Sequence, residues 1–233
     1  LFHRALPFLA ESSSSIVQMP VHSAFSRLCH TKSMRQIKLF ISSLVLIASS
    51  VQAMDLRDWK ERSFDGNTDY SHDGTAIRGE TRGTASVLYK EEKIDLSKTP
   101  VVNWRWKISN TYGTEHNEQS KSGDDYPARL YVVVKTGFLP WQTLALNYVW
   151  SSNQPVGTSW KNAFTDKAVM VVLDSGEENI NLWQSHSRNV IKDFKNYFGE
   201  EVDTLDGYAI MVDGDNTGQS ATAWFDAIEF TGE

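Results

Sequence analysis

Three groups of polar residues have types and spacing that could do chemistry, and the first is a charged loop at residues 121–129 (KSGDDYPAR). Adjacent carboxylates point to opposite sides of an extended chain, so Asp124 and Asp125 do not form a general acid/base pair by themselves. Either carboxylate could hold a ligand, bind Ca²⁺ or form an ion pair with Arg129 that fixes the loop. Charged clusters at the start of a strand are common places for binding sites.

The second group lies at the start of a predicted helix. His186 could act as a general base if a carboxylate orients its ring. Arg188, with Asn189 beside it, could bind an anionic group of a ligand near the helix N-terminus, or it could pair with one of the many acids. The chain contains no G-x-S-x-G or H-E-x-x-H motif, so a histidine without a nucleophile does not define a reaction.

The third group supplies oxygen donors near the C-terminus. The pattern D-x-D-x-x-G at residues 213–218 begins like a calcium-binding loop, but Thr217 and Trp224 stand where an EF-hand needs a ligand and a bidentate Glu. We therefore expect either a structural Ca²⁺ held by Asp213, Asp215 and Asp226 or a plain hairpin turn.

Aromatic residues are abundant after residue 53: all eight Trp and all eight Tyr lie in residues 54–233. Exposed rings of this kind can stack on the apolar faces of sugars while their polar atoms remain available for hydrogen bonds. Trp141, Trp160 and Trp183 lie in loop-like contexts, where they could form such a platform or anchor the loops. Trp104 and Trp106 alternate with polar residues, and this predicts that they are buried on one face of a strand.

The N-terminal segment has the pattern of a secretory signal. Residues 34–38 are basic, residues 39–48 (LFISSLVLIA) are apolar, and Val51 and Ala53 are small enough to precede a cleavage site. Ten residues of helix span about 15 Å, too short for a hydrocarbon core of about 30 Å. We expect residues 1–33 to be an upstream extension, residues 34–53 a signal peptide cleaved after Ala53, and residues 54–233 a periplasmic or secreted domain without a membrane span.

The composition of residues 54–233 limits the function. They hold 18 of the 23 basic and 28 of the 29 acidic residues, a net charge of −10, which argues against nucleic acid as a partner. The single cysteine is Cys29. A disulfide, a thiolate metal site and a cysteine nucleophile are therefore excluded from residues 54–233.

Short β-type runs separated by Gly, Asn and Asp dominate the predicted secondary structure. They cover residues 75–80, 101–108, 128–135, 143–150, 168–174, 208–213 and 221–230. Apolar residues at three- and four-residue spacing predict one helix at about 187–198, with Ser187 as its N-cap and Gly199 at its end. This pattern indicates a single all-β domain, an antiparallel β-sandwich of the jelly-roll type.

Five segments in this order resemble a bacterial exported family known only as a domain of unknown function, number 3047. They are residues 104–106, 121–132, 146–150, 188–194 and 213–218. The resemblance implies an exported single-domain protein and no particular activity. The closing run 223–230 (AWFDAIEF) is also similar to the last strand of galactose-binding-like jelly rolls, many of which are carbohydrate-binding modules with a structural calcium; this second similarity is an analogy of fold.

The leading hypothesis is an exported β-sandwich that binds a glycan or a similar polyhydroxylated ligand without turning it over. An alternative is a polysaccharide hydrolase or lyase that combines Asp124 or Asp125 with His186 or Arg188, provided that the fold brings those loops together. A hydrolase would need carboxyl groups about 5–5.5 Å or about 6.5–9.5 Å apart. A third hypothesis is an envelope protein whose aromatic surface contacts a protein partner, which the sequence does not identify.

Overall fold

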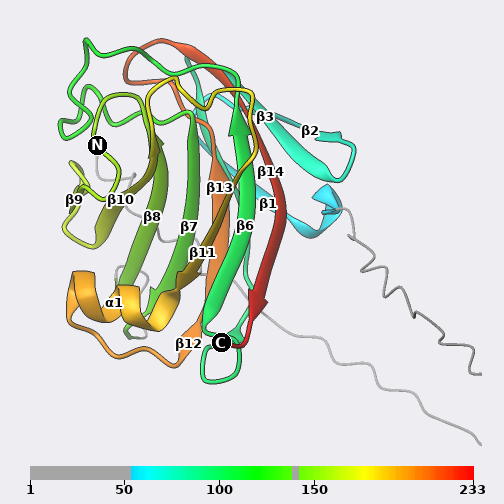
Figure 1. Cartoon of the computed structure of the whole chain (residues 1–233), viewed down its shortest axis with the longest axis vertical. Helices are drawn as coiled ribbons and strands as arrows, with labels where there is room; N and C mark the ends of the chain where they lie inside the picture. The colour runs from blue at the N-terminus through cyan, green and yellow to red at the C-terminus, as the bar shows by residue number, and fades with distance from the viewer. Residues whose placement is uncertain (1–53, 138–141) are drawn as a thin grey trace, which may run out of the picture. The chain divides into compact units, whose positions relative to one another are not determined.

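The structure is a computed structural model that describes residues 54–137 and 142–233. The predicted signal peptide and Trp141 lie outside the described residues. Two sheets pack face to face in the described part (Figure 1). The larger sheet has seven strands in the order β1 (Lys60–Asp65), β4 (Ala85–Lys90), β13 (Gly207–Met211), β7 (Ala128–Lys135), β8 (Thr143–Ser151), β10 (Ala168–Ser175) and β9 (Ser159–Lys161).

The second sheet has five strands, and a short pair of strands is hydrogen-bonded to neither sheet in register among the described residues. The five-stranded order is β11 (Gln184–Asn189), β6 (Val101–Ile108), β14 (Ser220–Thr231), β3 (Ala76–Arg82) and β2 (Asp69–Asp73), and the pair is β12 (Thr204–Leu205) with β5 (Ile94–Asp95). All strand pairs are antiparallel except β8 with β10. Because the chain passes repeatedly between the sheets, the predicted antiparallel β-sandwich of the jelly-roll type is confirmed.

The core between the sheets follows from the alternation of side chains along each strand. In β6, Trp104 and Trp106 point inward with their apolar neighbours and are buried, as predicted. Leu130 and Val132 of β7 face them from the larger sheet and belong to the same core cluster. The intervening residues of each strand therefore point to the outer face of their sheet.

One short helix, α1 (Val190–Phe198), follows β11, as the sequence predicts. Its predicted start is wrong, because Ser187 pairs with Asn103 inside β11. The side chain of Asn189 caps the helix instead and accepts a hydrogen bond from the backbone N–H of Lys192 at 2.9 Å. Gly199 ends the helix in a left-handed conformation, as predicted. A 3₁₀ turn (Leu56–Asp58) precedes β1, and no helix of the described residues is long and apolar enough to cross a membrane.

Candidate binding face

The outer face of the seven-stranded sheet is apolar, although outer faces of sandwiches are usually polar. Its buried side chains form a cluster separate from the main core, made of Ala85, Val87, Tyr131, Val133, Ala145, Ala168, Ala209 and Met211, with Phe64 and Tyr89 packed against it. All of these residues belong to strands of the same sheet. Within the described residues, neither a helix nor a second sheet contributes to this cluster.

The strand register places one residue from each of the seven strands on a line across this face. We call this line the cross-strand row; its members, from β1 to β9, are Lys60, Tyr89, Ala209, Tyr131, Asn147, Met170 and Trp160. Neighbouring strands lie about 4.8 Å apart, so Tyr89 and Tyr131 are separated by about 10 Å and Tyr131 and Trp160 by about 14 Å. Aromatic side chains are thus spaced along a path that crosses the strands.

Two N–H donors in the cross-strand row have no hydrogen-bond partner among residues 54–137 and 142–233. The side chain of Asn147 is 2% exposed, and its amide nitrogen is buried and unpaired. The indole nitrogen of Trp160 is buried and unpaired as well. Leaving such a donor unsatisfied costs about 1–3 kcal/mol, and buried donors without partners are rare in native proteins. Both groups therefore lack an acceptor within the part of the chain that the structure describes.

Arg129 joins the cross-strand row to the predicted charged loop. Its buried guanidinium donates to both carboxylate oxygens of Asp213, with an Nε–Oδ1 distance of 2.8 Å, and to the backbone carbonyl of Asp124. Its Nη1 lies 3.4 Å from the hydroxyl of Tyr131. The predicted ion pair of Arg129 thus forms chiefly with Asp213, while Asp124 accepts hydrogen bonds from the Asn162 amide at 2.9 and 3.1 Å.

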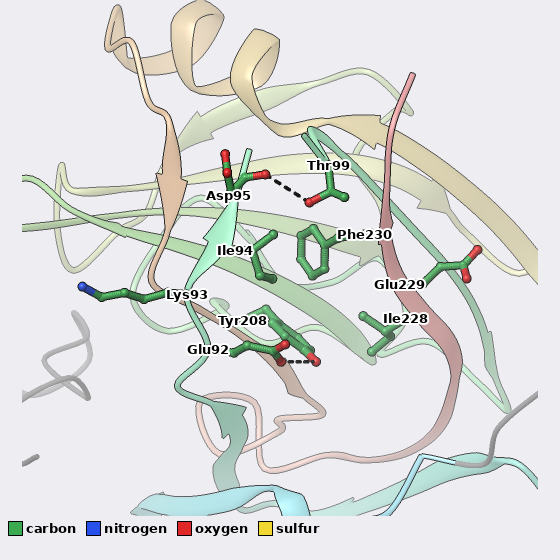
Figure 2. Close-up of a pocket in the computed structure, with 9 residues that line it drawn as sticks. All are labelled: Glu92, Lys93, Ile94, Asp95, Thr99, Tyr208, Ile228, Glu229 and Phe230. Atoms are coloured by element: carbon green, nitrogen blue, oxygen red, sulfur yellow. Dashed lines mark hydrogen bonds between the residues drawn. The ribbon is translucent and has the colours of Figure 1, made fainter. Parts of the chain in front are cut away.

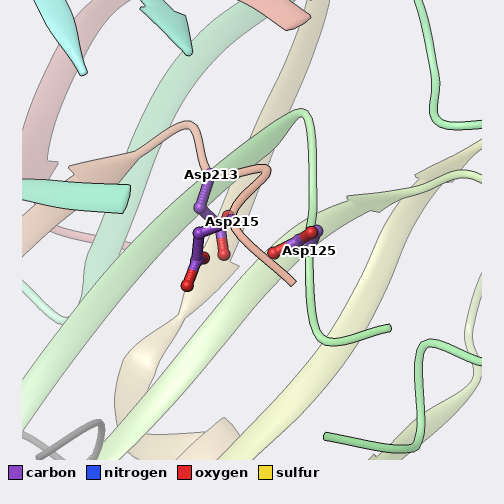
Figure 3. A group of neighbouring side chains, drawn as sticks. All are labelled: Asp125, Asp213 and Asp215. Carbon is purple, nitrogen blue, oxygen red and sulfur yellow. The ribbon is translucent and has the colours of Figure 1, made fainter. Parts of the chain in front are cut away.

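The charged loop and the 213–218 loop meet although about 90 residues separate them in the sequence (Figure 3). Carboxylate oxygens of Asp125, Asp213 and Asp215 lie within 4.8 Å of one another. Asp125 accepts hydrogen bonds from the Asn216 side chain at 2.8 Å and from the Thr217 backbone N–H at 2.6 Å. These bonds hold the two loops together at the end of the sheet.

Burial raises the pKa of the Asp213 carboxyl to about 8. The nearby carboxylates of Asp125 and Asp124 raise it further, and Arg129 opposes them. Three acids close together are a ligand set that a divalent cation accepts. However, Asp213 already holds Arg129, and Asp125 already holds two loop donors, so calcium here stays a prediction.

The predicted calcium ligands are only partly brought together. Asp213 and Asp215 lie in the acidic cluster, but Asp226 lies within β14 of the other sheet. It accepts hydrogen bonds from the Arg105 guanidinium at 3.0 Å and from the Thr75 hydroxyl at 2.9 Å. Asp125 joins the cluster in its place, which the spacing of Asp125 in the sequence does not indicate.

The predicted group around the helix start lies on the other side of the larger sheet, between the two layers. His186 contacts the Asp174 carboxylate at 2.6 Å, so a carboxylate does orient its ring. Arg188 forms a two-point ion pair with Asp193 at 2.6 and 2.8 Å. Asp124 and Asp125 accept hydrogen bonds elsewhere, from Asn162 and from the 213–218 loop respectively.

The predicted tryptophan platform is divided between the two sheets. Trp160 lies in β9 at the edge of the larger sheet, with its ring centroid 6.4 Å from that of Tyr126. Trp183 precedes β11 of the smaller sheet and is 38% exposed. The two described members of the platform therefore cannot contact one ligand surface together.

A separate pocket of 410 Å³ lies where β5 and the start of β13 approach the end of β14 (Figure 2). Its floor includes Tyr208 and Phe230, whose ring centroids are 5.3 Å apart, and its rim carries acids such as Glu92. The Tyr208 hydroxyl lies 3.4 Å from the Glu92 carboxylate, and burial raises the pKa of that hydroxyl. None of the residues predicted to form a site lines this pocket.

Comparison with solved structures finds distant likenesses. The structure described as "CBM4 structure and function" has 11% identity and a TM-score of 0.35 and covers 76% of this chain and 96% of that one. The xyloglucanase domain of NopAA from Sinorhizobium fredii, in complex with cellobiose, has 10% identity and a TM-score of 0.42 and covers 78% and 98%. The family 12 xyloglucanase from Bacillus licheniformis has 11% identity and a TM-score of 0.37 and covers 75% and 100%. Likenesses this distant do not carry a ligand or an activity over to this chain.

The sequence itself gives a clearer relationship. No curated protein sequence matches the chain. Residues 57–229, nearly all of the described sandwich, match the family described as "Protein of unknown function (DUF3047)". Three of the five segments that resemble this family contribute Arg129, Tyr131, Asn147 and Asp213 to the outer face of the larger sheet and its acidic end. The chain belongs to the DUF3047 family.

Proposed function

We propose that this protein is an exported, non-catalytic binding protein whose ligand is a glycan lying along the cross-strand row. The observation that carries the proposal is the combination of aromatic rings and unpaired N–H donors on one apolar face. Tyr89, Tyr131 and Trp160 supply the rings, and Asn147 and Trp160 supply the unpaired donors.

The chemistry of this face favours a carbohydrate over a hydrocarbon or a lipid tail. A sugar ring presents an apolar C–H face, which packs on aromatic rings, and oxygen atoms at its edges. Those oxygens could accept hydrogen bonds from the amide of Asn147 and the indole of Trp160 once the side chains that bury these two nitrogens move aside. A purely apolar ligand would leave both donors unpaired and would gain nothing from their position.

The length of the row favours an extended chain of sugars. Seven strands separated by about 4.8 Å place the first and last members of the row about 29 Å apart. A single sugar could contact only one of the aromatic positions. An oligosaccharide could stack on Trp160 and Tyr131 and place hydroxyls beside Asn147, which lies between them in the row.

Binding without turnover is supported by the state of the nearby carboxylates. A raised pKa, as at Asp213, is also a property of an acid catalyst. Both oxygens of Asp213 are engaged by Arg129, however, and Asp125 is engaged by the 213–218 loop. A hydrolase needs one carboxyl group placed to protonate the leaving oxygen and a second placed for the water or the sugar. The hydrogen bonds of Asp213 and Asp125 instead hold the loops in place.

The test is calorimetric titration of the full chain with a panel of neutral oligosaccharides of four to six sugars. We expect saturable binding to at least one of them, and a loss of about tenfold or more in affinity for Trp160→Ala. Trp183→Ala is the matched control, because it removes a more exposed indole from the other sheet. A flat response across the panel, or a loss in the control alone, would overturn the proposal. Release of new reducing ends would replace binding with hydrolysis.

Export is part of the same proposal, because a glycan ligand in the periplasm or outside the cell requires it. Sequencing the N-terminus of protein recovered from the periplasmic or culture fraction tests this directly. We expect the mature chain to begin at Met54. Recovery of an uncleaved chain in the cytoplasm would contradict it.

A further inference from the structure

The outer face of the five-stranded sheet carries a second line of residues, with different chemistry. Trp224 of β14 is the register partner of Lys107 in β6 and of Arg78 in β3. The Lys107 ammonium lies 4.3 Å from the centroid of the Trp224 ring and 5.3 Å from that of Trp183. On the other side of Trp224, the guanidinium carbon of Arg78 lies 5.9 Å from the centroid of the same ring. We call Trp183, Lys107, Trp224 and Arg78 the tryptophan–cation row; strands β6, β14 and β3 of the five-stranded sheet are labelled in Figure 1.

The charge of Lys107 is not matched by an acid. Arg78 forms an ion pair with Glu80, and Arg105 forms one with Asp226. Lys107, by contrast, has no salt bridge in the described part of the chain, and its ammonium contacts two indole rings. Cation–π contacts hold a cation in place without neutralising its charge. The row therefore presents an ordered positive charge beside the exposed ring of Trp183.

A groove of 370 Å³ continues the tryptophan–cation row toward the end of β14. Its polar lining comes from Asn103, Arg105, Ser185, His186, Ser187 and Glu229. Arg105 belongs to both surfaces, because its guanidinium also lies 4.8 Å from the Trp183 ring centroid. The exposed indole and the groove are thus continuous.

An irregularity in β14 shapes one side of this groove. The register with β6 shifts between Asp226 and Glu229, and Ala227, which lines the groove, has a φ of 53°. A left-handed conformation at a residue other than glycine is strained and persists where the surroundings impose it. Such outliers gather at ligand sites, and this one lies in the lining of the groove.

We propose that this surface binds an acidic sugar, a uronic acid unit, independently of the cross-strand row. The sugar ring would stack on Trp183, its hydroxyls would enter the groove, and its carboxylate would lie beside Lys107. Charge complementarity carries the choice of an acidic ligand, because Lys107 is an uncompensated cation within a region whose net charge is −10. At physiological salt, interactions are screened beyond about 8 Å, so acids farther away than this weaken the attraction little. The nearer carboxylates are Glu229, which lines the groove, and Asp73, which accepts a hydrogen bond from the Trp224 indole at 2.7 Å.

The experiment is calorimetric titration of the full chain with oligogalacturonate and oligoalginate, with cello-oligosaccharide of equal length as the neutral arm. We expect saturable binding of a uronic acid oligosaccharide that Lys107→Gln and Trp183→Ala each weaken about tenfold or more. Trp160→Ala, on the other sheet, is expected to leave this affinity unchanged. The neutral arm reports the cross-strand row, so failure of either proposal is visible separately.

Two results would overturn the inference. One is the absence of saturable binding to both acidic oligosaccharides. The other is binding that Lys107→Gln leaves unchanged. Binding to vesicles of anionic phospholipid that depends on Lys107, without binding to the oligosaccharides, would also overturn it and would assign this surface to a membrane.

Discussion

Strands β6 and β7 have the same length and face each other across the core, yet their outer sides differ completely. In β6 buried and partly exposed residues alternate without a break, whereas in β7 every residue from Ala128 to Val134 is buried. Alternation is typical of a strand with one face in water, and a continuous buried run is typical of a strand covered on both faces. The inner halves of both strands build one core. The outward-pointing residues differ. Those of β6 include the partly exposed cations Arg105 and Lys107, whereas those of β7 include the buried Arg129 and Tyr131.

The two faces also differ in how their polar groups are satisfied. On the smaller sheet, Glu80 accepts from Arg78 and from Arg82, and these hydrogen bonds lower its pKa. On the larger sheet, burial raises the pKa of Asp213, and Asn147 has an unpaired amide. A surface whose charges are paired near water is stable by itself. A buried face with unpaired donors gains hydrogen bonds when a ligand supplies acceptors.

The largest expected effect comes from Arg129→Ala. This change removes a buried guanidinium that donates to Asp213 and to the backbone carbonyl of Asp124, and breaking a buried hydrogen-bonded pair in this way costs about 3–5 kcal/mol. We expect the midpoint of urea unfolding to fall accordingly. Arg82→Ala is the matched control on the smaller sheet, since Arg82 is 76% exposed and also pairs with an acid. We expect it to cost about 1 kcal/mol or less. Equal losses in the two variants would contradict the contrast between the faces.

The pH dependence of stability should have opposite signs on the two faces. An unfolded Asp has a pKa of about 3.9, and that of folded Asp213 is about 8. The folded state therefore holds a proton that the unfolded state has lost, and stability falls as pH rises from about 4 to 8 by on the order of a few kcal/mol. Glu80, with its lowered pKa, contributes stability at neutral pH that is lost as pH falls below about 4.5.

Unfolding by urea between pH 5 and 8.5, compared with Asp213→Asn, measures this dependence. The amide cannot titrate but retains an oxygen for the Nε–H of Arg129, so we expect a flatter curve in the variant. Glu80→Gln should leave the decline above pH 5 intact. A wild-type stability that rises through this window, or one that declines equally in Asp213→Asn, would show that another group controls it.

Much of the sandwich could be predicted from the sequence, because strands that face the core carry a periodic apolar signal. All seven predicted runs contain strands, and the alternation in β6 correctly placed Trp104 and Trp106 in the core. The polar strands β1, β2 and β11 were not predicted, and neither were the apolar strand β4 (ASVLYK) and the short strands β5, β9 and β12. In β11 (QSHSRN) no side chain is apolar, and the strand is defined by its pairing with β6. A pattern of single residues cannot show such pairing.

The candidate sites depended on register and on contacts distant in sequence, which no local pattern encodes. Asp226 was grouped with Asp213 because both are oxygen donors near the C-terminal strand pair, but the register of β14 places Asp226 opposite Arg105. Asn147 was not predicted as a site residue, since an asparagine in an apolar run gives no sign that its amide lacks a partner. Trp160 and Arg129 were predicted, and the fold places both at the outer face of the larger sheet.

A smaller effect, with opposite directions for stability and binding, is expected from Asn147→Leu. Leucine has nearly the same shape as asparagine and no unpaired donor, so the free energy of unfolding should stay the same or rise by about 1 kcal/mol. Affinity for the neutral oligosaccharide should fall, because a hydrogen bond to the ligand is lost. Urea unfolding and calorimetry on the same preparation measure both quantities. A loss of both stability and binding would mean that Asn147 supports the sheet and does not contact a ligand.

The smallest expected effect is that of calcium on the acidic cluster, where the two loops meet at the end of the larger sheet. The carboxylates of Asp125, Asp213 and Asp215 are close enough for a cation, but loop donors and Arg129 occupy two of them. A cation would have to replace these hydrogen bonds, so we expect 5 mM Ca²⁺ or EDTA to shift the thermal midpoint by no more than about 1 °C. Asp226→Asn serves as the control, because that carboxylate belongs to the smaller sheet. A rise of several degrees with Ca²⁺ that Asp125→Asn abolishes and Asp226→Asn retains would establish a calcium site on the larger sheet. It would also mean that the loops exchange their present hydrogen bonds for metal ligands.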